Sequence, residues 1–259
     1  MKRSLSLLCF LILLLAAACC AAEETIPTAQ ELFAQNPEPD VPMNCDPRMD
    51  PLLVLVNKET PLPGDYVPEL VSVDLPHKPG LAVQQLRPEA AEALKRLFQA
   101  ADADGIKLGV VSGYRSYGTQ KAIHARKVAQ RGRSAELTSA PAGRSEHQLG
   151  LAMDVSCASI NYRLNAIFSK TEEGQWVEAH CAEYGFIIRY RAEWQKITGY
   201  KVEPWHIRYV GPEHAKLVTA LHVPYEIYMD YLKLCWDARS HLPAGASAGI
   251  PPTTCAGPT

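Results

Sequence analysis

The sequence predicts a single α+β domain, because short apolar strands and amphipathic helices follow one another without a regular alternation. The chain has 259 residues, of which 47% are hydrophobic and 21% are charged, a composition typical of a globular protein. This length suits one catalytic domain together with an export signal. The net charge of -2 gives no indication of a nucleic-acid-binding surface.

The first elements of the predicted domain are a helix, a strand and a second helix. The helix from Pro88 to Ala103 has proline at its first position and apolar residues on one face, and Gly105 ends it. An apolar strand follows over residues 106–111, and a helix that is polar on one side covers 118–130. A loop rich in Ser, Ala and Gly then covers 134–144.

The second half of the domain contains further short elements of both kinds. Strands are predicted over residues 149–155, 186–190 and 205–210, and helices over 174–184, 212–221 and 225–236. These elements place a catalytic domain at 51–238. Residues 23–50, rich in Pro, Glu and Asn and without periodicity, are expected to be a linker. Residues 239–259, rich in Pro, Ala, Gly and Thr, are expected to be a disordered tail.

The first 22 residues are typical of a signal peptide. Lys2 and Arg3 form a positive start, Leu5 to Leu15 is a short apolar core, and small residues suited to cleavage follow. Cys19 or Cys20 would be the site of a lipid anchor if this is a lipoprotein signal, although alanine replaces the usual leucine three residues before either. We therefore expect export to the cell envelope, to the periplasm or the cell surface, with membrane contact only through such an anchor.

Export changes how the eight cysteines are interpreted. Those beyond the signal region form no CxxC pair, which argues against a structural zinc cluster. In an oxidising compartment disulfides are the default, and Cys157 and Cys181, which flank one compact segment, are the expected pair. The pairing of Cys45, Cys235 and Cys255 remains open.

The candidate chemistry lies in three short stretches, at residues 112–120, 145–154 and 203–211. A catalytic zinc takes three imidazole or carboxylate ligands and leaves one position open for water. His147, Asp154 and His206 supply such a set, and Asp154 lies in an apolar stretch where an unpaired carboxylate is costly. Glu203, across Pro204 from His206, can lie beside the metal without binding it, as a general base must.

These stretches resemble the VanY-type D-alanyl-D-alanine carboxypeptidase family, which includes related L,D-carboxypeptidases. Residues 145–154 match its pattern S-x-H-x-x-G-x-A-x-D, residues 203–206 match E-x-W-H, and residues 113–120 match G-Y-R-S-x-x-x-Q. The likeness covers about residues 51–235 in the expected order. It implies a Hedgehog/D,D-peptidase-like fold, with a small, mostly antiparallel sheet flanked by helices and zinc in a cleft on the sheet.

The resemblance also implies roles for individual side chains. One zinc ion would be held by His147, Asp154 and His206, with Glu203 as the base and then the acid. Arg115 is the candidate for holding a substrate carboxylate or the oxyanion, because a guanidinium matches paired oxygens. The other substrate-binding candidates are Gln120, Ser145, Trp205 and Arg208. Arg208 shares a strand face with His206 by the pleat, and its alternative role is to support the strand.

The expected activity is hydrolysis of the D-Ala-D-Ala bond in peptidoglycan stem peptides by a monomer that binds no nucleic acid. The motifs do not separate this activity from L,D-carboxypeptidase action on tetrapeptide stems. A third alternative is a non-catalytic wall-binding module, and a fourth is an exported module that binds another protein. The presence of Glu203 beside a full ligand set argues against both of the non-catalytic alternatives.

Overall fold

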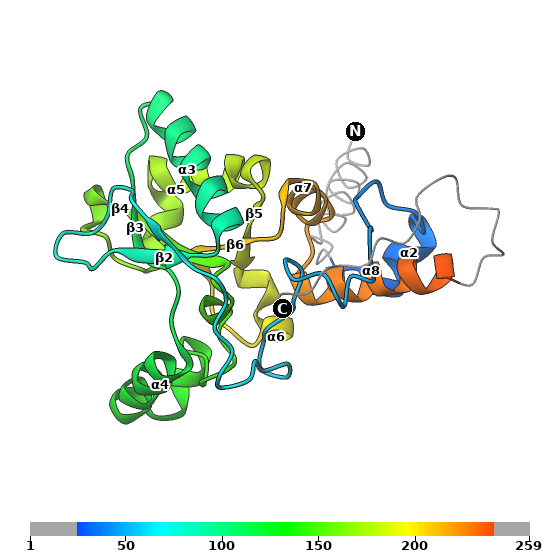
Figure 1. Ribbon diagram of the computed structural model, residues 1–259, viewed down its shortest axis with the longest axis horizontal. Helices are drawn as coiled ribbons and strands as arrows, with labels where there is room; N and C mark the ends of the chain where they lie inside the picture. The colour runs from blue at the N-terminus through cyan, green and yellow to red at the C-terminus, as the bar shows by residue number, and fades with distance from the viewer. Residues whose placement is uncertain (1–24, 241–259) are drawn as a thin grey trace, which may run out of the picture.

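The computed structural model of the protein describes residues 25–240 (Figure 1). The expected signal peptide at 1–22 and residues 241–259 of the expected tail lie outside this range. Among the helices between residues 25 and 240, none combines the length and the apolar character that a membrane span requires.

A four-stranded antiparallel sheet forms the centre of the fold. Its strand order is β3 (Leu108–Ser112), β4 (Ala152–Cys157), β6 (Glu203–Tyr209) and β5 (Phe186–Tyr190). A separate antiparallel pair, β1 (Val71–Val73) and β2 (Gln84–Leu86), lies beside it. The predicted α+β class, with small antiparallel sheets flanked by helices, is confirmed.

The two faces of the central sheet have different surroundings. Alternate residues of β4, Met153, Val155 and Cys157, join the main apolar core. The helix α3 (Pro88–Ala103) supplies much of the rest of that core, and α5 (Glu172–His180) lies near it (Figure 1). Asp154 points to the opposite face because side chains alternate along a strand. The polar chemistry therefore lies on the side of the sheet away from this core.

Most predicted elements occur where the sequence places them. The helices α3 and α7 (Pro212–Leu221) have the predicted bounds, while α4 covers Tyr117–Arg131 and α8 continues to Ser240 from Tyr225. The strand predicted from residue 149 begins only at Ala152. The preceding residues instead form a 3-10 turn that ends at Gly150, whose φ of 68° is left-handed.

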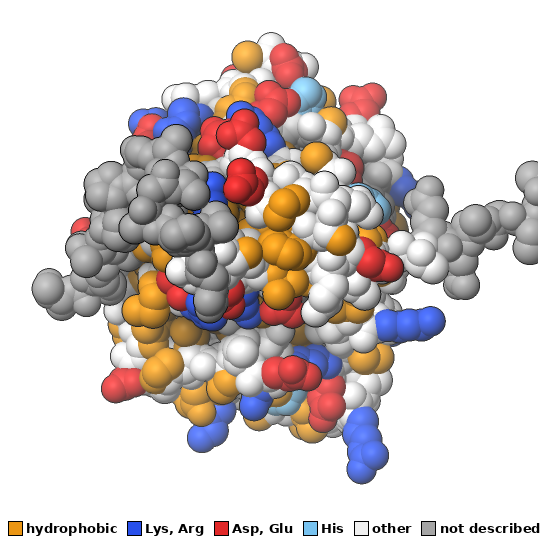
Figure 2. Space-filling model, turned by 90° about the vertical axis from the view of Figure 1, so that its right-hand side faces the viewer, with side chains coloured by type: hydrophobic (Ala, Val, Ile, Leu, Met, Phe, Trp, Pro, Cys, Tyr) orange, Lys and Arg blue, Asp and Glu red, His pale blue; other side chains and the backbone are white. Residues whose placement is uncertain are grey.

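Residues 25–50 are not a structureless linker. They contain α2 (Ala29–Gln35), which begins with a capping box between Thr28 and Glu31. Leu32 of this helix is buried in a second apolar core that α8 also lines, and the Tyr231 hydroxyl of α8 donates to the carbonyl of Asn36 at 2.7 Å. Figure 2 shows this end of the molecule, where acidic and basic side chains are interspersed around apolar ones.

The expected Cys157–Cys181 disulfide is wrong, since both residues are free and buried thiols. Cys157 Sγ instead lies 3.2 Å from the Ser159 hydroxyl and 3.8 Å from that of Thr171. Burial raises the pKa of the Cys181 thiol to about 12, so it is not a reactive thiolate. Cys235 of α8 is a third buried free thiol. These cysteines act as small apolar core residues.

Replacing Leu32 by alanine should test whether α2 is part of the folded domain. Leu32 is 5% exposed, so its truncation should lower the free energy of unfolding by about 2–5 kcal/mol. Urea denaturation measures this change, and Val67→Ala, at a residue 66% exposed, is the control that should have little effect. An unchanged midpoint for Leu32→Ala would mean that α2 is detached in solution, as a linker would be.

Candidate metal centre

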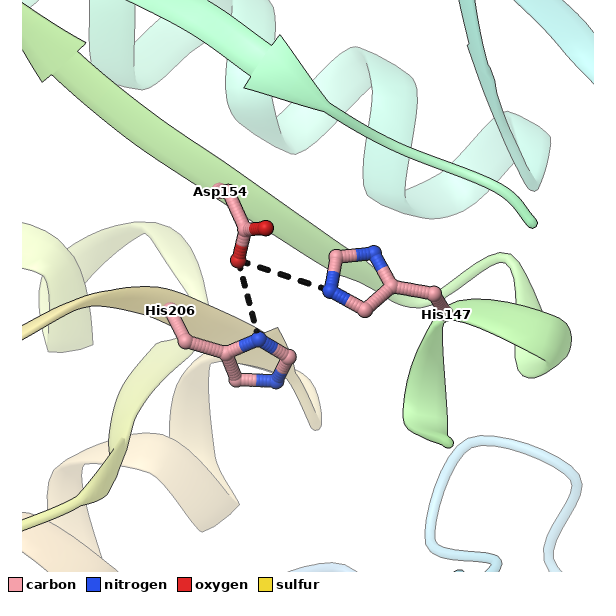
Figure 3. A group of neighbouring side chains, drawn as sticks. All are labelled: His147, Asp154 and His206. Carbon is pink, nitrogen blue, oxygen red and sulfur yellow. Dashed lines mark hydrogen bonds and ion pairs between the residues drawn. The ribbon is translucent and has the colours of Figure 1, made fainter. Parts of the chain in front are cut away.

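Three side chains that are distant in the sequence meet on the polar face of the sheet. Asp154 Oδ1 lies 3.0 Å from His206 Nδ1 and 3.4 Å from His147 Nε2 (Figure 3). All three residues are buried, and one ligand atom from each lies within 4.8 Å of the others. The sequence prediction that His147, Asp154 and His206 lie together agrees with this geometry.

The strand register and one turn place these three residues. Asp154 of β4 lies directly opposite His206 of β6, so their side chains leave the same face as neighbours. His147 comes from the 3-10 turn that precedes β4. The strand β3 carries a bulge between Val110 and Ser112, next to its pairing with Asp154. Such irregularities re-aim side chains beside functional sites.

A second bulge brings Glu203 toward the site. Ile188 and Tyr190 of β5 are separated by one residue, whereas their partners on β6, Ile207 and Glu203, are separated by three. In a regular strand Glu203 and His206, an odd number of residues apart, would point to opposite faces. The extra residues on β6 break the alternation, and both side chains line the same cavity.

A hydrogen bond at the ring nitrogen that faces away from Asp154 orients each of the two histidine rings. The Nδ1 atom of His147 lies 2.7 Å from the carbonyl oxygen of Gly113, so it carries the proton and leaves Nε2 free to bind a metal. The Nε2 atom of His206 lies 3.2 Å from Glu146 Oε2, so Nδ1, which faces Asp154, is the nitrogen of that ring that a metal would take. Two imidazole nitrogens and a carboxylate oxygen are donors that zinc accepts, so the residues present fit a zinc ion.

Glu146 is the functional residue that the sequence analysis missed. It has no exposed side-chain surface, and it accepts from Arg189 Nε at 2.9 Å and Arg208 Nη1 at 3.2 Å. Burial alone would raise the pKa of Glu146, but the two guanidiniums hold that pKa well below its usual range. Glu146 is therefore a carboxylate that accepts from His206. Its position in the motif is a variable one, so the pattern gave no signal.

Arg208 is not placed to bind substrate, contrary to the expectation. It is fully buried and does not line the cavity. Besides Glu146, its guanidinium donates to the carbonyls of Leu52 and Val54 at 2.9 and 3.0 Å. The strand β6 does direct Arg208 to the face of His206, but the preceding chain covers it there. The alternative role, support of the strand, fits these contacts.

The other substrate-binding candidates line a cavity of about 550 Å³ around the histidines. They are Arg115, Gln120, Ser145 and Trp205. Arg115 Nη1 lies 3.9 Å from Asp154 Oδ2, and its Nη2 donates to the Ser145 hydroxyl at 3.4 Å. Arg115 Nε and Gln120 Oε1 are buried and have no hydrogen-bond partner within residues 25–240. Buried atoms of this kind are available to a ligand.

Glu203 has the character of a proton-transfer group. It lines the cavity, is partly buried and forms no ion pair within the described part of the chain. Burial raises the pKa of this carboxyl to about 7, with Asp154 adding to the effect and His206 opposing it. A carboxyl whose pKa lies near neutrality can both accept and return a proton.

Comparison with known proteins is consistent with this site. Residues 83–212 match the family described as VanY, D-alanyl-D-alanine carboxypeptidase. The Bacillus subtilis protein YodJ is 43% identical over 186 residues, which are 70% of this chain and 68% of YodJ. The chain therefore belongs to the VanY D-alanyl-D-alanine carboxypeptidase family, and its α+β fold is that of a carboxypeptidase family.

Two solved structures of carboxypeptidases resemble the chain in sequence and in fold. The LdcB LD-carboxypeptidase, whose structure was described as revealing the basis of peptidoglycan recognition, is 43% identical to this chain, with a TM-score of 0.66. The match covers 70% of this chain and 88% of LdcB. The D,D-pentapeptidase VanY from a VanB-type resistance cassette, in complex with Zn(II), is 34% identical with a TM-score of 0.60. That match covers 70% of this chain and 99% of that one.

Replacing Glu146 by glutamine should weaken metal binding without removing a ligand. The loss of the carboxylate that accepts from His206 should lower metal affinity about 10–100-fold. Competition with a chromophoric chelator measures this affinity. Glu226→Gln is the matched control, because Glu226 also pairs with Arg189, at 2.6 Å, but does not contact His206. An equal loss in both variants would assign the effect to general disturbance of the buried charges.

The pKa of Glu203 predicts a pH-dependent stability difference in the metal-free protein. Its folded value of about 7 exceeds its ordinary value of 4.5, so the folded state holds the extra proton between these pH values. Stability due to this group is present below pH 4.5 and is lost as the pH rises toward 7. Glu203→Gln should therefore gain about 2–3 kcal/mol relative to the wild type over this window.

Urea unfolding of both metal-free proteins at several pH values measures this difference. The comparison isolates Glu203, because the other titrating groups are common to both proteins. A constant difference from pH 4 to 8 would show that folding does not shift the pKa of Glu203.

Proposed function

We propose that this protein is a zinc-dependent carboxypeptidase that removes the terminal D-alanine from peptidoglycan stem peptides by cleaving the D-Ala-D-Ala bond. The observation that carries the proposal is the group of His147, Asp154 and His206 in a cavity that Glu203 also lines. The Zn(II) complex of the VanY D,D-pentapeptidase, 34% identical, supports both the metal and the bond.

Zinc held by the two histidines and Asp154 would supply Lewis acidity at the scissile carbonyl. Glu203 takes the proton of the attacking water and then delivers it to the leaving amine of D-alanine. Its pKa of about 7 suits both steps, although a bound cation would lower that value.

The remaining cavity residues position the peptide. Arg115, beside the Asp154 carboxylate, binds the terminal carboxylate or the developing oxyanion through its fork of N–H donors. Ser145 and Gln120 offer hydroxyl and amide groups for the peptide backbone, and Trp205 forms part of the cavity wall. The substrate is thus fixed at several points around the carbonyl that reacts.

L,D-carboxypeptidase action on tetrapeptide stems is the second candidate. The LdcB LD-carboxypeptidase shares 43% identity with this chain, compared with 34% for the VanY D,D-pentapeptidase, and its TM-score is also higher. Both activities use the same carbonyl chemistry and differ in the residue before the terminal D-alanine. The proposal places either activity in the cell envelope, after export directed by the expected signal at residues 1–22, with an optional lipid anchor.

Mass spectrometry of muropeptides distinguishes these candidates. Purified protein is incubated with pentapeptide and tetrapeptide stems, with and without a chelator. Loss of one alanine from pentapeptides alone supports D,D-cleavage, and loss from tetrapeptides supports L,D-cleavage. No loss from either stem with zinc-loaded protein would exclude the carboxypeptidase proposal and favour a non-catalytic module.

Glu203→Gln should abolish turnover and leave zinc in place. The amide keeps the shape of the side chain but cannot accept the proton, so hydrolysis should fall by at least about two orders of magnitude. Zinc content by metal analysis is the companion measurement, and His206→Ala, which removes a ligand, is the control expected to lose metal. Loss of zinc from Glu203→Gln would instead identify Glu203 as a ligand.

A further inference from the structure

The cavity extends from the candidate metal centre along one face of α4. Gln120, Ile123, Lys127 and Arg131 line it, and their spacing of three or four residues places them on one side of the helix. Lys201, from the loop before β6, lines the same cavity. The cavity therefore has three basic side chains, Lys127, Arg131 and Lys201, in addition to Arg115.

These three basic side chains have no carboxylate within ion-pair distance in the described part of the chain, unlike Arg115, Arg189 and Arg208. Within residues 25–240, Lys127, Arg131 and Lys201 form no ion pair with a carboxylate, and the Lys127 ammonium donates only to the carbonyl of Thr138, at 2.9 Å. The cavity carboxylate of Glu146, by contrast, is neutralised by Arg189 and Arg208. Glu203, which also lines the cavity, interacts with Lys127 at longer range but forms no ion pair with it. With three basic side chains, this end of the cavity carries excess positive charge and is suited to an anionic group.

Unpartnered polar atoms line the same side. Ser139 is 6% exposed and Gln120 is 1% exposed, yet Ser139 Oγ and Gln120 Oε1 have no hydrogen-bond partner between residues 25 and 240. Both residues line the cavity. Gln120 belongs to α4, and Ser139 lies between Thr138 and Ala140, whose backbone carbonyls accept from Lys127 and Gln120 of that helix. Buried polar atoms without partners indicate that a ligand supplies them.

The position of this region relates it to a particular part of the substrate. Seven residues of α-helix separate Gln120 from Lys127, a rise of about 10 Å, which is the length of about three extended peptide residues. Arg115, whose Nη1 lies 3.9 Å from Asp154 Oδ2, serves the terminal D-alanine and the scissile bond in the proposed function. Lys127 and Arg131 lie about two or more helical turns beyond Gln120 on α4, where the cavity wall is available to peptide residues upstream of that bond.

We propose that Lys127, Arg131, Lys201 and Ser139 form a subsite, the α4 subsite, for a free carboxylate that the peptide carries upstream of the scissile bond. This inference rests on the proposed carboxypeptidase function and names its substrate class. The enzyme selects stem peptides with an ionised side-chain or α-carboxylate in this segment over those in which that group is an amide. A guanidinium and an ammonium recognise the anion, and a neutral amide loses the charge-assisted bonds.

The test uses two synthetic peptides that end in D-alanine and differ only in one upstream carboxylate or carboxamide. The wild type should cleave the acidic peptide with a KM about tenfold lower, and added salt should narrow the difference. In Lys127→Gln/Arg131→Gln the KM values for the two peptides should become nearly equal. Arg131→Gln alone, at an exposed side chain, should show a smaller change in the same direction.

Lys121→Gln/Arg126→Gln is the matched control, because it removes the same two charges from exposed positions of α4 that do not line the cavity. It should keep the preference for the acidic peptide. Equal KM values for the two peptides in the wild type, or an equal preference loss in the control, would overturn the α4 subsite.

Equilibrium binding of both peptides to Glu203→Gln by calorimetry separates this inference from the proposed function. Tighter binding of the acidic peptide without turnover by the wild type would refute the carboxypeptidase activity and keep the subsite. Turnover of both peptides by the wild type, together with equal binding of both to Glu203→Gln, would keep the carboxypeptidase activity and refute the α4 subsite.

Discussion

The buried carboxylate of Glu146 is the interaction on which the candidate site depends. Its oxygens accept from Arg189, Arg208 and the His206 ring, all of which are buried. Breaking such a cluster from one side leaves an uncompensated buried charge, which is strongly destabilising. Because Arg208 also holds the carbonyls of Leu52 and Val54, the same charges join β6 to the chain that precedes the domain core. The orientation of the His206 ring in the candidate metal centre is thus tied to the packing of the whole sheet.

The chemistry also depends on departures from regular strand geometry. A regular antiparallel sheet would place Asp154 and His206 side by side but direct Glu203 to the other face. The extra residues of β6 near Pro204, which cannot donate to the ladder, let Glu203 enter the cavity. The site therefore combines a rigid in-register pair of ligands with a base on a locally irregular segment.

The sequence predicted the parts of this protein in which local signals and global packing agree. Proline at position 88, an apolar face and a terminating Gly105 defined α3 correctly, and the spaced motifs picked out the three residues that lie together in the candidate metal centre. The sequence did not reveal Glu146, because its partners Arg189 and Arg208 become neighbours only through strand pairing. The helix α2 was missed because seven residues carry little periodicity, although Thr28 and Glu31 form a capping signal. Cys157 and Cys181 were paired by separation along the chain, which does not report the direction of either side chain.

The ion pair between Arg189 and Glu226 has a consequence for comparing this chain with its relatives. Glu226 belongs to α8, beyond the residues 83–212 that match the family. The two buried guanidiniums of Arg189 and Arg208 are therefore matched by two carboxylates only when Glu226, which is partly buried on α8, is present. A relative can keep every motif residue and still lack the second carboxylate that pairs with Arg189, if another group, or none, occupies the place of Glu226. The motifs fix the donor atoms of such a site, while the charge balance of the buried guanidiniums behind it depends on a helix that carries none of the motifs.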